Sequence, residues 1–187
     1  LAINSNLGIK KREVERLLDA TQNVELDLYT SNESIGDHAE YIRDGLKWEQ
    51  WIENFEYLLE GQRLHGLHCM CTINALCLES LDKFLDLLMY YKKKHGKDAI
   101  NFSLNILRFP SFQSPLVLPD EIRQFRGNKL QQWFNKNNSS EFLHEMELNH
   151  LQKLLDYLDI VYTPHSESFQ LPKLRNDFKK FYEQYDE

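Results

Sequence analysis

The chain has 187 residues, of which 42% are hydrophobic and 12% aromatic, which is enough apolar side chain for one folded domain. Its formal net charge of -7 gives no general electrostatic attraction to nucleic acid or to anionic lipid. No apolar run approaches the ~20 residues that cross a bilayer. We therefore expect a folded protein without nucleic-acid or membrane partners. The cytoplasm is the expected compartment, because the chain shows no secretory signal and its three cysteines form no disulfide framework.

Both ends of the sequence lie within expected secondary structure. The chain begins at Leu1 inside an extended run, without an initiator methionine, and it ends at Glu187 inside a helical pattern that has no capping residue. We expect both ends to be cut from a longer protein.

Extended runs and helical patterns alternate over the first part of the chain. The expected strands are Leu1–Ile3, Val24–Tyr29, Leu64–Ile73 and Ile100–Leu107. The expected helices between them are Lys10–Ala20, Asp37–Asp44, Trp48–Glu60 and Glu79–His95, the last closed by Gly96. Strands that alternate with helices of this length predict parallel strands joined by right-handed crossovers.

The alternation ends after the fourth strand. Phe109–Pro119 contains three prolines and no clear period, so we expect a loop there. Three further helices are expected, with a short loop containing Pro164 and Pro172 before the last: Asp120–Lys136, Glu141–Tyr162 and Leu174–Tyr185. The sequence thus predicts an α/β region over 1–109 and a helical C-terminal extension over 110–187.

Each expected strand is apolar in its body and ends in small polar residues. The four ends are Asn4–Asn6, Thr30–Ser34, Thr72–Asn74, and Asn105 to Arg108. Ligands of parallel α/β folds bind at these ends, and amides and hydroxyls suit a polar ligand with ribose, amino and carboxylate groups. Turn and cap formation is the better explanation of any single end. Four such ends in sequence favour a shared site.

Arg43 lies just past the richest of these polar segments. An arginine there could hold a ligand carboxylate through two hydrogen bonds. It could equally form an ordinary surface pair with Glu40 or Asp44. Spacing alone leaves both interpretations open.

The three cysteines do not form a recognisable metal site. Cys69 and Cys71 lie two residues apart in an expected strand and so share one face, and Cys77 lies at the start of the next helix. The spacing matches no zinc motif, while His65 and His68 flank the strand on opposite faces. We therefore expect buried, apolar cysteines. No phosphate-binding loop and no catalytic triad signature is present.

Several of these segments resemble, in order, the barrel of the radical S-adenosylmethionine enzymes, in the branch with a twitch or SPASM-like extension. The segment Tyr29–Gly36, continued by Ala39–Leu46 and Trp51–Asn54, resembles the fourth-strand region of that barrel and is the most specific match. The other matching segments are Ile3–Gly8 for the third strand end, Thr72–Leu76 for the fifth, and Asn105–Pro110 with Val117–Pro119 for the sixth and the entry to the extension.

The resemblance implies the second half of a partial (βα)6 barrel, its last four βα units, followed by a twitch-like helical extension. The full-length protein would bind a 4Fe-4S cluster through a C-x-x-x-C-x-x-C loop after the first barrel strand. It would reductively cleave S-adenosylmethionine to a 5′-deoxyadenosyl radical, which abstracts hydrogen from a small-molecule or peptide substrate. A flavodoxin or ferredoxin would supply the electron.

The resemblance also assigns roles to residues by position. Ser31 and Asn32 would contact ribose or carboxylate, and Arg43 would contact the methionine carboxylate. Thr72 and Asn74 would reach the ribose or the substrate. Asn105 would face the adenine end of the ligand.

The chain departs from the family because it lacks the cluster-binding loop, whose ligands we expect upstream of Leu1. This chain alone is therefore not expected to be catalytically competent. The alternative is a non-catalytic α/β scaffold or nucleoside-binding protein that lacks the cluster. A doubly wound α/β enzyme is a weaker possibility, since no phosphate loop follows any strand.

Overall fold

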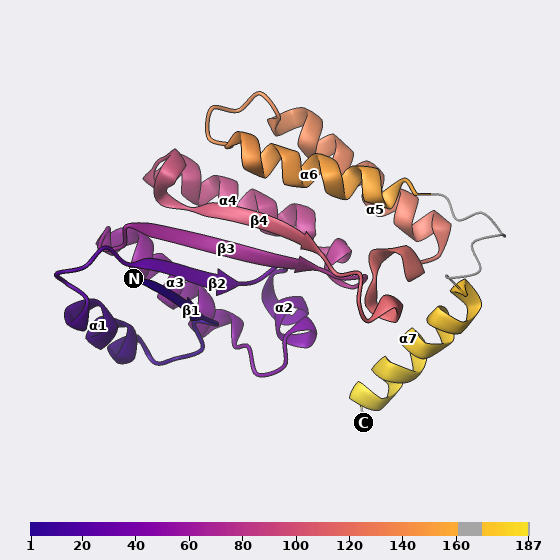
Figure 1. Ribbon diagram of the computed structural model, residues 1–187, viewed down its shortest axis with the longest axis horizontal. Helices are drawn as coiled ribbons and strands as arrows, with labels where there is room; N and C mark the ends of the chain where they lie inside the picture. Colours follow the sequence, from indigo (N-terminus) through magenta and orange to yellow (C-terminus); the bar gives the residue numbers. More distant parts are fainter. Residues whose placement is uncertain (161–169, 187) are drawn as a thin grey trace.

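The computed structural model describes residues 1–160 and 170–186 and has an α/β fold (Figure 1). Its sheet has four strands in the order β1-β2-β3-β4, and every neighbouring pair is parallel. The strands are β1 (Ala2–Ser5), β2 (Asp27–Ser31), β3 (Gly66–Ile73) and β4 (Asn101–Ile106). The predicted α/β class and parallel strands are confirmed. The strand order runs in one direction, without the reversal that marks the switch point of a doubly wound sheet.

The helices follow the predicted alternation. They are α1 (Lys11–Ala20), α2 (Gly36–Ile42), α3 (Trp48–Gly61), α4 (Leu81–His95), α5 (Asp120–Asn137), α6 (Glu145–Leu158) and α7 (Leu171–Tyr185). Short 3₁₀ turns supplement them: η1 (Cys77–Glu79), η2 (Lys97–Ala99), η3 (Ser111–Gln113) and η4 (Pro115–Val117). No helix in the described ranges is both long and apolar enough to span a bilayer.

Four predicted boundaries were wrong by three or four residues, at the start of β2, at both ends of α6 and at the start of α7. β2 begins at Asp27 because Val24 lies in a turn, where its side chain is exposed. α6 begins at Glu145, not at Glu141, and it ends at Leu158, before the predicted end at Tyr162. The predicted loop around Pro164 lies outside the described residues. α7 already begins at Leu171, because a proline such as Pro172 is tolerated in the first turn of a helix.

One face of the sheet is packed against helices. Along β3 the residues Leu67, Cys69, Cys71 and Ile73 are buried and alternate with partly exposed ones. These buried side chains belong to the same core cluster as Trp51 of α3, and α3 and α4 lie behind the strands in Figure 1. The core also includes residues of α5 and α6, so the predicted extension packs on the α/β region.

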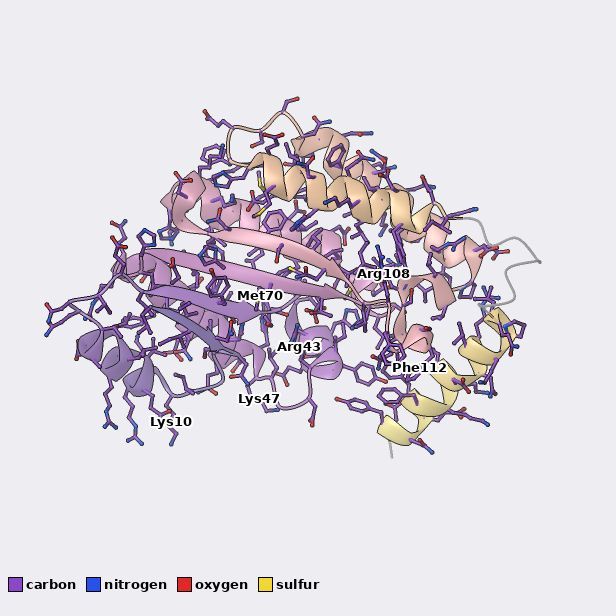
Figure 2. The ribbon with its side chains drawn as sticks, viewed as in Figure 1. Lys10, Arg43, Lys47, Met70, Arg108 and Phe112 are labelled. Carbon is purple, nitrogen blue, oxygen red and sulfur yellow. The ribbon has the colours of Figure 1, made fainter. Side chains whose placement is uncertain are left out.

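The opposite face carries polar and aromatic side chains that none of the described helices buries. The strand register aligns them in rows across the sheet, and all are half-buried or exposed: Tyr29, His68 and Asn101 in one row, Ser31, Met70 and Ser103 in the next, and Thr72 with Asn105 in the third. This open face is turned toward the viewer in Figure 1, and Met70 is labelled on it in Figure 2.

A buried ion pair closes the β4 edge of the sheet. Lys92 Nζ donates to both oxygens of Glu147 at 2.8 and 3.0 Å and to the carbonyl of Ile100 at 2.7 Å, and both charged side chains are 0% exposed. Glu147 in turn accepts the backbone N–H of Phe102 at 3.0 Å. Burial lowers the pKa of Lys92, and the hydrogen bond to Glu147 opposes this shift. The edge of β4 is therefore paired with side chains of α6, not with another strand.

We predict that Glu147→Gln lowers the free energy of unfolding by about 3–5 kcal/mol, because it leaves Lys92 buried without a counter-charge. Urea unfolding measures the change. Glu145→Gln, an exposed residue in the same helical turn, is the matched control and is expected to shift stability by less than about 0.5 kcal/mol. Equal midpoints for the two variants would show that the pair does not hold the edge.

Candidate functional site

The candidate site lies where β2, β3 and β4 end. The three strands point the same way, so their carboxyl ends and the segments that follow meet at one end of the sheet (Figure 1). The predicted site residues come from these segments and from the end of α2. Binding sites of parallel α/β folds form at such an end because the connecting segments converge there.

Glu33 is the centre of this region. β2 leaves the sheet after Ser31, and the Glu33 carboxylate then accepts the backbone N–H of Thr72 at 3.2 Å, where a neighbouring strand would otherwise supply a carbonyl. Arg43 donates to the same carboxylate twice, from Nε at 2.9 Å and from Nη2 at 2.5 Å. The Glu33 side chain is 2% exposed and that of Arg43 is 26% exposed.

Arg43 thus holds a carboxylate of the protein itself, in the bidentate geometry that the sequence predicted for a ligand. Its partner is Glu33, and neither Glu40 nor Asp44, the surface partners that spacing suggested, pairs with it. A ligand carboxylate would share the guanidinium with Glu33. Figure 2 shows Arg43 beside α2, at the end of the strands.

Asn32 is completely buried and has one unpaired donor. Its Oδ1 accepts the backbone N–H groups of Glu33 at 2.9 Å and Ser34 at 3.3 Å, which fixes the orientation of the amide. Its Nδ2 has no hydrogen-bond partner among the residues that the structure describes. Because buried polar groups are almost always paired, this donor is an exception among the described residues.

The structure brings some of the remaining predicted residues together and separates others. Ser31, Thr72 and Asn105 lie on the open face, where Thr72 and Asn105 are aligned across β3 and β4. Asn105 donates to Ser103 Oγ at 3.3 Å and is exposed. Asn74 is different, since its Oδ1 accepts the N–H groups of Leu76 at 2.9 Å and Cys77 at 3.0 Å and so forms the turn before α4.

Cys69 and Cys71 lie on the other face of the sheet, and Cys77 lies in η1, after the end of β3. Cys69, Cys71 and Cys77 are all free and buried, as predicted. Burial raises the pKa of Cys71 and of Cys77 well above the usual value, so both thiols stay protonated. Within residues 1–160 and 170–186, no group of three or more His, Cys, Asp or Glu side chains is arranged to hold a metal ion.

A second polar cluster, which the sequence did not predict, lies beside the first. His38 Nδ1 lies 3.1 Å from Ser34 Oγ and 2.8 Å from Ser80 Oγ, and the two hydroxyls are 2.5 Å apart. His38 also lines a cavity of about 200 Å³, together with Glu79 and Arg126. Both serines are buried, which makes them positioning groups for the imidazole and not accessible nucleophiles.

The sequence indicates some of these unpredicted residues more clearly than others. Glu33 is the one acidic residue in the polar segment Thr30–Ser34, ten positions before Arg43, and this charge pattern could have indicated the pair. Ser34 and His38 are four residues apart across the start of α2. Ser80 is 42 residues beyond His38 in sequence, so only the fold brings the two together.

We predict that Glu33→Gln lowers the free energy of unfolding by about 2–3 kcal/mol, less than the loss for a fully buried pair, since part of Arg43 is exposed. The exposed Glu49 gives the control variant Glu49→Gln. A double-mutant cycle with Arg43→Ala tests the assignment, because Arg43→Ala should cost much less in the Glu33→Gln background. Additive losses would contradict the direct pairing.

A second prediction concerns acid stability. Burial lowers the pKa of His38, so the folded protein favours the neutral imidazole. As the pH falls through about 6.5 the unfolded chain takes up a proton that the folded state resists, and stability decreases. His38→Asn should therefore reduce the loss of stability between pH 7.5 and 5.5, measured by urea unfolding at both values.

His65 supplies the control of opposite sign. Its hydrogen bond to Asp27 raises the pKa of His65, so its contribution is present below about pH 6.5 and is lost as the pH rises through the folded value. His65→Asn should steepen the loss of stability on acidification. The same pH dependence in parent and His38→Asn proteins would overturn the assignment to His38.

Comparison with known protein families, curated proteins and solved structures finds no match for this chain.

Proposed function

We propose that this chain is the second half of a partial (βα)6 radical S-adenosylmethionine barrel with a helical extension, and that the ends of β2, β3 and β4 bind S-adenosylmethionine. The observation that carries the proposal is the position of Ser31, Thr72 and Asn105 on the sheet face that none of the described helices covers. In a barrel this face is the interior. Parallel strands in sequential order, with α3 and α4 on the other face, are what half of such a barrel requires.

The residues present suit the ligand's polar groups. Hydroxyls such as those of Ser31 and Thr72 both donate and accept, which matches ribose hydroxyls. Asn32 is completely buried, so its orphaned Nδ2 would donate to a carboxylate or ribose oxygen only after the segment that follows β2 moves. The Met70 thioether, between Ser31 and Ser103 on the open face, offers apolar, polarisable contact to an adenosine ring.

The chain's own residues would bind and orient the ligand. Glu33 joins the segment after β2 to both β3 and Arg43, and so fixes the Asn32 amide relative to the open face. α7 lies next to the same region, where its Tyr182 stacks on Tyr41 of α2 and the following Asp186 accepts a hydrogen bond from the Tyr41 hydroxyl at 2.9 Å. In the proposal this helix borders the substrate space.

The chemistry that S-adenosylmethionine supplies when bound and reduced is hydrogen-atom abstraction from the substrate. The 4Fe-4S cluster that this reaction needs does not fit the described residues, because Cys69 and Cys71 are buried on the helix side of the sheet and Cys77 is buried in η1. In the proposal its ligands come from polypeptide upstream of Leu1, and flavodoxin or ferredoxin is the electron donor.

The buried, protonated cysteines favour a second candidate function, a non-catalytic nucleoside-binding protein or scaffold of α/β fold. It uses the same open face and needs no cluster. A nucleoside-binding protein would differ from the first candidate in iron content and in turnover, and a scaffold would differ also in lacking the nucleoside site.

Titration calorimetry of the chain with S-adenosylmethionine tests the binding site. Saturable binding is expected, and Thr72→Val should weaken it about five- to ten-fold through the loss of one hydrogen bond. Thr21→Val makes the same chemical change in the turn after α1, away from the candidate site, and this control should bind like the parent. Absence of binding in every protein would contradict the proposed S-adenosylmethionine site and would favour the non-catalytic scaffold.

The protein extended upstream of Leu1 to its natural start then separates the two candidates. After anaerobic supply of iron and sulfide we expect it to be brown and, once reduced, to cleave S-adenosylmethionine. A colourless protein that still binds the ligand would support the non-catalytic candidate.

A further inference from the structure

A groove on the β4 side of the molecule shares only Asn105 with the proposed nucleoside site. It has a volume of about 520 Å³ and lies between the second half of β4 and the outer turns of α6. Three apolar residues line it, Leu104, Ile106 and Ile160, together with polar and charged ones: Asn105, Arg108, His150, Lys153, Asp156 and Tyr157. Figure 2 shows Arg108 where β4 ends, between the sheet and α6.

The groove is locally positive in an acidic protein. Arg108 and Lys153 contribute two positive charges and Asp156 one negative charge, whereas the whole chain carries a formal charge of -7. Asp156 already accepts a hydrogen bond from Gln152 at 2.7 Å. Across residues 1–160 and 170–186, neither Arg108 nor Lys153 forms an ion pair.

Arg108 is oriented without a carboxylate. Its guanidinium lies over the ring of Tyr157, 5.5 Å from the centroid, in a cation–π contact. Tyr157 is itself held by a hydrogen bond of 2.9 Å between its hydroxyl and Ser114 Oγ. The donors of Arg108 are thus positioned at the groove by an aromatic ring, which leaves them available to an acceptor.

His150 adds a neutral donor whose tautomer is fixed by the fold. Its Nδ1 accepts the backbone N–H of Leu104 at 3.2 Å, so in the neutral ring the proton is on Nε2. Burial and the nearby Lys153 lower the pKa of His150, which keeps the ring neutral at physiological pH. His150, Lys153 and Tyr157 are spaced three and four residues apart and therefore share one face of α6.

We propose that this groove binds an oxyanion, the phosphate or carboxylate group of a small molecule whose apolar part lies on Leu104, Ile106 and Ile160. Arg108 and Lys153 supply charge-assisted hydrogen bonds, and His150 Nε2 supplies a neutral one. The groove lies along the edge of β4 under α6, and the nucleoside site proposed above lies over the open face. Asn105 borders both, but Arg108, Lys153 and His150 belong to the groove alone.

The test is a titration of the ¹⁵N-labelled chain with inorganic phosphate and, separately, with acetate, at constant ionic strength, followed by amide chemical shifts. We expect saturable shifts at residues 104–108 and 150–157 with at least one of the two anions, and the tighter anion identifies the group. Arg108→Ala and Lys153→Ala should each weaken binding about ten-fold, through the loss of a charge-assisted hydrogen bond.

The controls remove a like charge elsewhere. Arg12→Ala on α1 and Lys136→Ala on α5 delete exposed cations outside the groove and should leave the affinity unchanged. Shifts that stay linear with concentration, or an equal loss in all four variants, would overturn the proposal as general surface electrostatics. Because the readout uses no S-adenosylmethionine, failure of the nucleoside site leaves this result unaffected, and the reverse also holds.

Discussion

The buried pair of Lys92 and Glu147 determines where the sheet ends. An edge strand presents unpaired backbone groups, and a parallel sheet exposes them unless something covers the edge. Here Glu147 and His150 of α6 accept the N–H groups of Phe102 and Leu104, so that side chains replace a neighbouring strand. Removing two charges from water is costly, and further hydrogen bonds offset the cost: Lys92 donates to the Ile100 carbonyl, and Glu147 accepts the N–H groups of Phe102 and His144. The position of α6 follows from these contacts, and so does the groove beside it.

Because side chains alternate along each strand, the two faces of the sheet carry different kinds of residue. On β3 the cysteines face the helices, and His68, Met70 and Thr72 face outward. This separation could be predicted from the sequence, because Cys69 and Cys71 are two residues apart in a strand and must share a face. The βα alternation and the helices were predictable for the same reason, since their apolar spacings are local. The boundaries of the helices and strands were less predictable, because the first residues of β2 and α6 depend on tertiary packing.

The contacts that define the candidate site were not predictable in this way. Arg43 was identified as a carboxylate binder, but its partner depends on where β2 leaves the sheet and exposes the N–H of Thr72 to Glu33, 39 residues away in sequence. Asn74 shows the opposite case: capping of the following turn was recognised as an alternative to ligand binding, and its oxygen is used in that turn. Local polar patterns therefore located the end of the sheet correctly without specifying which side chains bond to each other.

The alternation of side chains along β3 also limits which residues could hold the proposed iron–sulfur cluster. A strand cannot turn its cysteines toward the open face without a one-residue shift of register, and such a shift would bury Met70 and Thr72 and expose Leu67 and Ile73. The loss of that apolar burial makes the shift unfavourable. Thiolate ligands for a cluster on the open face must then come from polypeptide other than β3. The open face would provide ligand contacts, the helix side would provide stability, and the β4 edge would remain a separate surface with its own electrostatic character.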